Sequence, residues 1–215
     1  MTDSTEPTRL FLVTPRQVDI EAFGPLLAEA LAGGDVAAVL VATGDQEKDI
    51  EAIAARLVPI IQEAGAAALV SDYTRVAGRV KADGVQIGTG LGDLGAAVES
   101  FRPKRIVGAG NLHSRHAAME AGELGADYVF FGRPHGDTHD APHSKALQLA
   151  EWWSDLMEIP AVIMAGRSLE HIGEAVATGA DFVGLNEAVW SNSEGPAEGV
   201  RLAKAALHTS GRRAA

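Results

Sequence analysis

The sequence contains no cysteine, and this absence removes several kinds of chemistry at once. A chain without thiols has no disulfide framework, no thiolate zinc site and no cysteine nucleophile, so any reaction depends on other side chains or on backbone amides. Basic residues are also scarce, because 18 Lys and Arg stand against 29 Asp and Glu and give a formal net charge of -11. They are scattered along the chain, whereas nucleic acids and membrane surfaces attract a concentrated basic patch. We therefore expect no nucleic-acid or membrane partner.

Long apolar segments are missing as well. No stretch approaches the roughly 20 apolar residues of a membrane span. The first residues, MTDSTEPT, lack the positive charge and the apolar run of a secretory signal. These features favour a cytoplasmic protein. At 215 residues the chain suits one barrel-sized domain, which we predict over residues 9–208, with a disordered N-terminus at 1–8 and a flexible tail at 209–215.

What the sequence does contain is a recurring cassette. An Ala-rich amphipathic segment is followed by Gly or Ala with Asp, and then by a short apolar run. The four copies begin at Ala32, Lys81, Gly125 and Gly179. Gly suits the left-handed residue that ends a helix, and the apolar run behind it is typical of a strand buried on both faces. Each cassette therefore predicts a joint between a helix and the next strand.

The remaining segments complete an alternation of eight strands and eight helices. Strands outside the cassettes are expected at residues 10–13, 67–70, 104–108 and 161–165. Helices are expected at residues 19–32, 46–64, 74–80, 94–100, 114–124, 144–157, 169–178 and 196–207. Alternating elements with short connections indicate parallel strands joined by crossover helices. The pattern predicts an α/β fold, a single (β/α)8 TIM barrel, and a doubly wound open sheet is the alternative.

In such a barrel the reactive groups lie on loops that follow the strands. The Asp residues of three cassettes, Asp83, Asp127 and Asp181, precede their strands, and we expect them to have structural roles. The candidate loops begin after each strand, and the most polar of them is the segment RPHGDTHDAPHSK at residues 133–145.

This segment carries His135, His139 and His143 at intervals of four residues. Such spacing would place three imidazoles on one face of a helix, where they could bind a divalent metal. Gly136 and Pro142 argue against a continuous helix. The alternative is a mobile polar loop that closes over the mouth of the barrel.

His113 stands just before an expected helix, at the mouth of the barrel. A side chain that titrates near neutral pH is a natural general acid or base at this position. The alternative is a histidine that only caps the helix or packs beside its start.

Several segments resemble the thiamine phosphate synthase family, which includes the related thiazole tautomerase. The best stretches are VSDYTRVAGRVKADGVQIGT and HSRHAAMEAGELGADYVFFG, and IPAVIMAG and GADFVGLNEAV fall where the family has its closing motifs. The resemblance implies a barrel enzyme that joins a hydroxymethylpyrimidine diphosphate to a thiazole phosphate with Mg2+.

Carried over to this chain, the resemblance implies a catalytic role for His113 and Asn111 and makes Asp72 the Mg2+ ligand. The substrate-binding residues that it implies are Ser71, Asp72, Lys145, Gly166, Arg167, Asn186 and Glu187. The sequence also departs from the family pattern. The cations that the family has after its second strand fall on Ala42 and Gly44, and a family Ser near the phosphate becomes Glu187. We expect Arg167 either to pair with Glu187 or to bind an anion itself.

Three functions fit these observations. The first is a thiamine phosphate synthase with a degenerate diphosphate site. The second is a tautomerase-like enzyme that transfers a proton through His113. The third is a non-catalytic barrel that binds a small ligand. All three imply a small phosphorylated or heteroaromatic ligand, and they leave open whether the chain forms a homo-oligomer.

Overall fold

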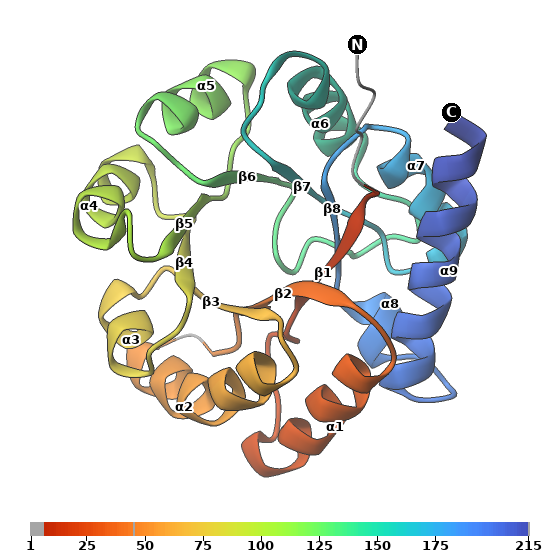
Figure 1. The fold of residues 1–215 in the computed structure, drawn as a ribbon, viewed down its shortest axis with the longest axis horizontal. Helices are drawn as coiled ribbons and strands as arrows, with labels where there is room; N and C mark the ends of the chain where they lie inside the picture. Colours follow the sequence, from red (N-terminus) through yellow and green to blue (C-terminus); the bar gives the residue numbers. More distant parts are fainter. Residues whose placement is uncertain (1–6, 45, 215) are drawn as a thin grey trace.

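Eight parallel strands close into a barrel, and helices surround it (Figure 1). This computed structural model describes residues 7–44 and 46–214. Each strand pairs with its neighbours in chain order, and β8 pairs with β1 to close the ring. The strands are β1 (Arg9–Val13), β2 (Val36–Val41), β3 (Ala67–Ser71), β4 (Gly84–Ile87), β5 (Ile106–Ala109), β6 (Tyr128–Phe131), β7 (Ala161–Met164) and β8 (Phe182–Leu185). The predicted TIM barrel is therefore confirmed, and the open sheet is wrong.

The helices follow the strands in the predicted alternation. They are α1 (Ile20–Ala32), α2 (Glu47–Glu63), α3 (Thr74–Arg79), α4 (Leu91–Phe101), α5 (Arg115–Glu123), α6 (Ser144–Leu156), η1 (Leu169–His171), α7 (Ile172–Val176), α8 (Glu187–Trp190) and α9 (Pro196–Ala214). Three differences from the expected boundaries stand out. Helix α8 was not expected, α4 begins at Leu91, and α9 continues to Ala214 where a tail was expected from residue 209. Most of the expected disordered N-terminus, residues 1–6, lies outside the described residues, and the domain boundaries stay a prediction.

The cassette residues form the joints that the sequence predicts. Gly125 and Gly179 have φ values of 93° and 75° at the ends of helices, and Lys81 takes the same left-handed region at 57°. The carboxylate of Asp127 accepts from the backbone N–H of Val107 on the neighbouring strand at 2.8 Å. Two more carboxylates bond in the same way: Asp83 with Ala68 N and Asp181 with Ala161 N, each at 2.8 Å. The structural role expected for these three carboxylates is therefore confirmed, and they brace the end of the barrel where the strands begin.

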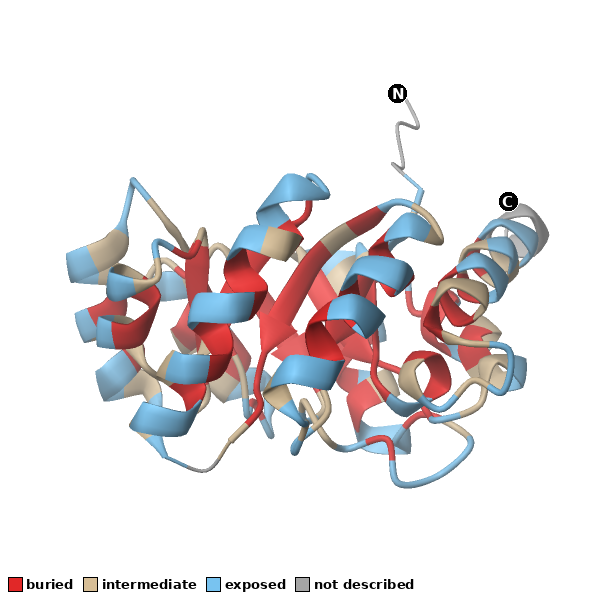
Figure 2. Cartoon of the chain, turned by 90° about the horizontal axis from the view of Figure 1, so that it is seen from below, coloured by how far each residue is buried: buried red, intermediate tan, exposed pale blue. Residues whose placement is uncertain are grey.

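The apolar core has two layers, because alternate strand residues point into the barrel and out toward the helices. Buried residues occupy the strands and the inner faces of the helices, and exposed residues occupy the outer faces (Figure 2). Phe11, Tyr128 and Phe130 fill much of the barrel interior. The Tyr128 hydroxyl donates to Oε1 of buried Gln86 at 2.9 Å. Gly108 makes room for this ring, because a Cβ there would lie 2.0 Å from Cζ of Tyr128.

None of the helices in the described part of the chain is long and apolar enough to cross a membrane.

Candidate functional site at the mouth of the barrel

One group of expected site residues lies where β3, β4 and β5 end. The hydroxyl of Ser71, the last residue of β3, donates to Oδ2 of Asp72 at 3.0 Å. The other oxygen of Asp72 accepts from the backbone N–H of Gly88, after β4, at 2.6 Å. Nδ2 of Asn111, after β5, donates to the carbonyl oxygen of Gly88 at 3.1 Å. Ser71, Asp72 and Asn111 are thus joined through Gly88 into one group, the Asp72 cluster.

Two members of the Asp72 cluster have a left-handed backbone. The φ angles are 60° at Asp72 and 58° at Asn111. This region is unfavourable for residues with a Cβ, and Asp and Asn tolerate it best because their short side chains bond to nearby backbone. Here the side chains of both residues bond to Gly88. Held backbone strain of this kind is frequent at functional sites, which agrees with the position of the cluster at the barrel mouth.

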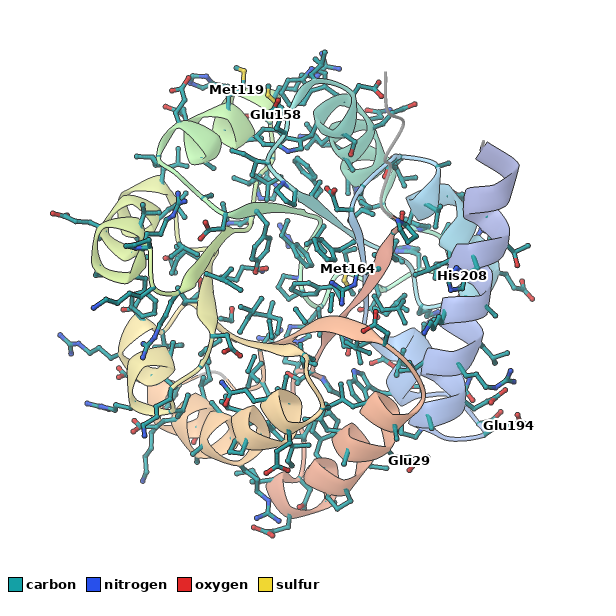
Figure 3. The ribbon with its side chains drawn as sticks, viewed as in Figure 1. Glu29, Met119, Glu158, Met164, Glu194 and His208 are labelled. Atoms are coloured by element: carbon teal, nitrogen blue, oxygen red, sulfur yellow. The ribbon has the colours of Figure 1, made fainter. Side chains whose placement is uncertain are left out.

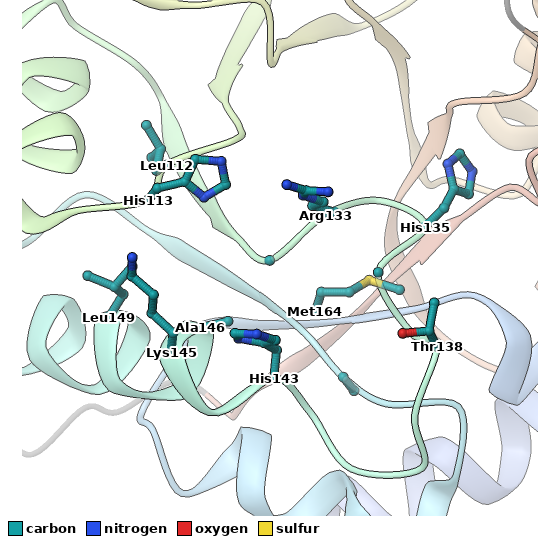
Figure 4. A pocket seen from close by; sticks show the side chains of 13 residues that line it. Leu112, His113, Arg133, His135, Thr138, His143, Lys145, Ala146, Leu149 and Met164 are labelled. Atoms are coloured by element: carbon teal, nitrogen blue, oxygen red, sulfur yellow. The ribbon is translucent and has the colours of Figure 1, made fainter.

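A second group of residues surrounds a cavity of about 480 Å³. Its lining includes Met164, the last residue of β7, whose side chain lies near the middle of the barrel (Figure 3). In Figure 4, His113 and Arg133 face Lys145 and His143 across this space, and His135 lies on the other side of Arg133 from His113. The titratable lining residues that the structure describes are all basic: His113, Arg133, His135, His143 and Lys145. We call this set the basic pocket.

The three histidines spaced by four do not converge. Nε2 of His135 lies 3.0 Å from the carbonyl oxygen of Thr14, after β1, and the ring of His139 lies 3.0 Å from the hydroxyl of Thr138. His135 and His143 both line the basic pocket, but their rings lie apart there (Figure 4). Within the described residues, no three His, Asp or Glu side chains are arranged to hold a metal ion. The geometry therefore does not support a metal site on these histidines.

The segment between β6 and α6 is fixed to the ends of three other strands. We call residues 133–143 the β6 loop. Besides the contact between His135 and β1, Asp137 lies beyond the end of β8 and is only 5% exposed. Oδ2 of Asp137 accepts from the backbone N–H of Glu187 at 2.7 Å, and Oδ1 accepts from Nδ2 of Asn186 at 3.2 Å. The backbone N–H of Arg167, after β7, donates to the carbonyl oxygen of His139 at 2.9 Å. The β6 loop is thus bonded in place rather than lying loosely over the mouth.

Arg167 has a different partner from the expected one. Its Nε donates to Oδ1 of Asp140 in the β6 loop at 2.8 Å, whereas Oε2 of Glu187 accepts from the hydroxyl of Ser191 at 2.7 Å. The hydrogen bond from Arg167, and then its charge, hold the pKa of Asp140 below its ordinary value. The same bond and the charge of Asp140 raise the pKa of Arg167. Arg167 thus pairs with Asp140 of the loop and not with Glu187, one of its two expected partners, and binding of an anion by Arg167 stays a prediction.

The structure divides the expected site residues into three groups. Ser71, Asp72 and Asn111 belong to the Asp72 cluster. His113 and Lys145 line the basic pocket. The residues after β7 and β8 lie beneath the β6 loop: Gly166, Arg167, Asn186 and Glu187. Sequence reasoning named no role for Arg133 or Asp137, although the density of polar residues after the sixth strand was a signal for both.

These features define the class of the protein, which is a single TIM barrel with a polar site built from loops that follow its strands. The family model described as "Thiamine monophosphate synthase" matches residues 10–189. A thiamine-phosphate synthase of Hyphomonas neptunium is 36% identical, and the match covers 94% of this chain and 96% of that protein. One from Rhodospirillum centenum is 36% identical over 89% of this chain and 94% of that protein.

The chain belongs to the thiamine monophosphate synthase family. A solved structure titled thiamine phosphate pyrophosphorylase from Pyrococcus furiosus superposes with a TM-score of 0.75. It is 24% identical in sequence and the match covers 94% of this chain and 96% of that one. At that identity the likeness supports the fold, and it agrees with the closed barrel described above.

Proposed function

We propose that this chain catalyses the condensation implied by its family, in which a hydroxymethylpyrimidine diphosphate and a thiazole are joined and diphosphate leaves. Its relatives are named as thiamine-phosphate synthases. The observation that carries the proposal is the basic pocket. In a chain of net charge -11, a cavity whose described titratable residues are all basic suits a polyanionic ligand.

The basic pocket replaces cations that the family pattern places elsewhere. The positions after β2 hold Ala42 and Gly44, which offer no charge. Arg133 and Lys145 supply cations after β6 and on the first turn of α6 instead. An Arg guanidinium and a Lys ammonium both form charge-assisted bonds to phosphate oxygens. The diphosphate site of this chain is therefore relocated on the barrel mouth rather than lost.

The chemistry needs little from the protein besides position and charge. The bond from the pyrimidine methylene carbon to the diphosphate oxygen breaks, and a bond from that carbon to the thiazole nitrogen forms. Negative charge grows on the leaving diphosphate, where preorganised cations stabilise it. Arg133 and Lys145 have this role in our proposal. His113, on the same cavity, donates a hydrogen bond to the departing group, and Asn111 orients the pyrimidine from the Asp72 cluster.

Magnesium fits the Asp72 cluster as a partner of the diphosphate. Mg2+ is usually bound by one or two carboxylates together with substrate phosphates. Asp72 offers one carboxylate at the mouth, and among the described residues no group of three such side chains would hold the ion alone. We therefore assign Asp72 as the ligand, and the ion would neutralise charge on the diphosphate when both are bound.

The proposal is tested by measuring product formation with the pyrimidine diphosphate, a thiazole acceptor and Mg2+. Loss of one charge-assisted bond costs about 1.5–3 kcal/mol, so Arg133→Ala and Lys145→Ala should each lower kcat/KM about 10- to 150-fold. Lys104→Ala is the matched control, because this exposed Lys precedes β5 at the opposite end of the barrel. It removes one positive charge and should leave kcat/KM unchanged.

The same variants separate the alternative functions. The protein would be a tautomerase rather than a synthase if no acceptor were turned over while a thiazole isomer were converted, and if His113→Ala abolished that conversion. Equal losses in Lys104→Ala and Lys145→Ala would show that net charge, and not the basic pocket, attracts the substrate.

A further inference from the structure

The ends of β7 and β8 are where TIM barrels commonly bind phosphate on backbone amides. In this chain the β6 loop already uses those donors. The N–H groups of Arg167 and Ser168 donate to the carbonyl oxygens of His139 and Asp140, at 2.9 and 3.3 Å. The N–H of Glu187 donates to Asp137 at 2.7 Å. A phosphate at this place would have to displace all three bonds.

The packing between the loop and β7 leaves no space for a phosphate either. A Cβ built on Gly166 would lie 2.0 Å from the carbonyl oxygen of Asp140 and 2.7 Å from the carbonyl carbon of Ala141. The backbone of the β6 loop therefore rests directly on the backbone of Gly166. Only a residue without a Cβ permits this contact. The family resemblance assigns Gly166 to phosphate binding, but here Gly166 packs against the backbone of the β6 loop.

Electrostatics and hydrogen bonding point the same way. Three carboxylates, Asp137, Asp140 and Glu187, lie around the ends of β7 and β8, and Arg167 is already paired with Asp140. In addition, Oδ1 of Asn186 is buried without a hydrogen-bond partner. The amide cannot turn over to satisfy this oxygen, because its NH2 group donates to Asp137. This oxygen lies beneath the β6 loop and adds an acceptor, not a donor, beside the ends of β7 and β8, which does not suit a phosphate.

We infer that the carboxylate of Asp137 takes the place of the substrate's phosphate, so that the thiazole acceptor of this chain carries a free hydroxyl and no phosphate. This inference rests on the proposed function for the reaction and on the geometry of the β6 loop for the choice of acceptor. Asp137 is then a specificity-determining residue. The anionic diphosphate binds at the basic pocket, and the uncharged end of the acceptor faces β7 and β8.

The acceptor preference is measured by kcat/KM for a hydroxyethylthiazole and for its phosphate, each with the pyrimidine diphosphate and Mg2+. We expect the wild type to prefer the alcohol at least 10-fold. Asp137→Asn keeps the size of the side chain and removes its charge, and it should shift the preference about 10-fold toward the phosphate. Asp155→Asn removes the same charge from the exposed last turn of α6, at the end of the helix away from the loop, and should leave the preference unchanged.

A second measurement uses inorganic phosphate alone and needs no turnover. In a titration followed by amide NMR, the N–H signals of Arg167, Ser168 and Glu187 should stay in place in the wild type. In Asp137→Ala they should move together and saturate, because removal of the carboxylate frees the donor of Glu187. Asp137→Asn carries less risk to folding; it removes the charge but keeps an oxygen for the Glu187 N–H, so the three signals should move less than in Asp137→Ala.

The outcomes separate the two proposals. A wild type that uses the thiazole phosphate more efficiently than the alcohol overturns the inference and leaves the proposed function standing. Saturable movement of the three amides in the wild type overturns it too. If neither acceptor is turned over, the proposed function fails, and the phosphate titration alone decides whether Asp137 closes the ends of β7 and β8.

Discussion

The hydrogen bond between Tyr128 and Gln86 crosses the barrel interior directly below the site, and its energetic role can be calculated. Both residues are almost completely buried, at 6% and 2% exposure, and their side chains lie 2.9 Å apart. Tyr128→Phe keeps the ring and its tilted contact with Phe11, whose centroid is 5.9 Å away. It leaves Oε1 of Gln86 without its donor. An unsatisfied buried acceptor costs about 1–3 kcal/mol, and this is the expected loss of unfolding free energy.

A double-mutant cycle isolates the interaction from the packing around it. Gln86→Met keeps the length of the side chain and removes its polar atoms, so the Tyr128 hydroxyl loses its acceptor. The double variant replaces both polar partners by apolar groups, a change that is often nearly neutral. By chemical denaturation, we expect the double variant to lose at least ~1 kcal/mol less than the sum of the two singles. Additive losses would mean that the bond contributes nothing beyond packing.

The same residue predicts how stability falls at alkaline pH. Burial, and then the charge of Asp127, raise the pKa of Tyr128 above its ordinary value of 10.0. The folded protein therefore holds the phenol proton more tightly than the unfolded chain does. The resulting stabilisation is complete below pH 10 and is lost as the pH rises further, at about 1.4 kcal/mol per pH unit. Tyr128→Phe should remove this part of the slope; an unchanged slope would refute the raised pKa.

Three further predictions concern the core and the mouth. Gly108→Ala would place a Cβ 2.0 Å from the Tyr128 ring. Such overpacking should lower the unfolding free energy by about 1–3 kcal/mol in denaturation experiments, and an unchanged value would refute the tight contact. Because the pKa of Asp140 is lowered by Arg167, their pair should persist above pH 4 and break as the pH falls through the folded-state value. The protection of the Arg167 amide, its exchange relative to an unfolded chain at the same pH, should then fall, as it should at neutral pH in Asp140→Asn; equal protection in both proteins would argue against a role for the pair. Asp72→Asn keeps an acceptor for Gly88 and should raise the Mg2+ concentration for half-maximal turnover about 10-fold, the effect of losing about 1.4 kcal/mol, whereas an unchanged requirement would remove Asp72 as the ligand.

The fold was predictable because local and global signals agree along this chain. The cassettes combine a helix-ending Gly, an Asp that bonds to the preceding strand and a buried apolar run, and each feature points to the same joint. The misses occurred where such signals are weak. Helix α8 has only four residues, too few for a periodic pattern. The end of α9 contains Thr, Ser and Gly, which favour helix poorly, but there the helix lies beside α7, where Ser210 is next to Gly173 (Figure 1).

The site was predictable in part, for a geometric reason. All strands of a parallel barrel end on the same side, so the residues that follow them meet at one mouth whatever their sequence separation. Contacts within that mouth depend on loop conformation, which no periodicity encodes. The sequence therefore suggested either Glu187, at the next strand end, or an anion as the partner of Arg167, whereas the β6 loop brings Asp140 to it. In the same way, nothing in the composition of the loop shows that Asp137 bonds to Glu187.

The net charge of -11 and the basic pocket are compatible because charges act locally. Screening by physiological salt limits interactions between exposed charges to about 8–10 Å. Carboxylates such as Asp127 and Asp181 lie at the end of the barrel where strands begin, so they contribute little at the opposite mouth. Within the mouth, cations gather beside β6 and α6, whereas carboxylates gather beside β7 and β8. The two halves therefore suit different groups: Arg133 and Lys145 suit the anionic diphosphate, and the carboxylates beside β7 and β8 suit an uncharged part of the acceptor.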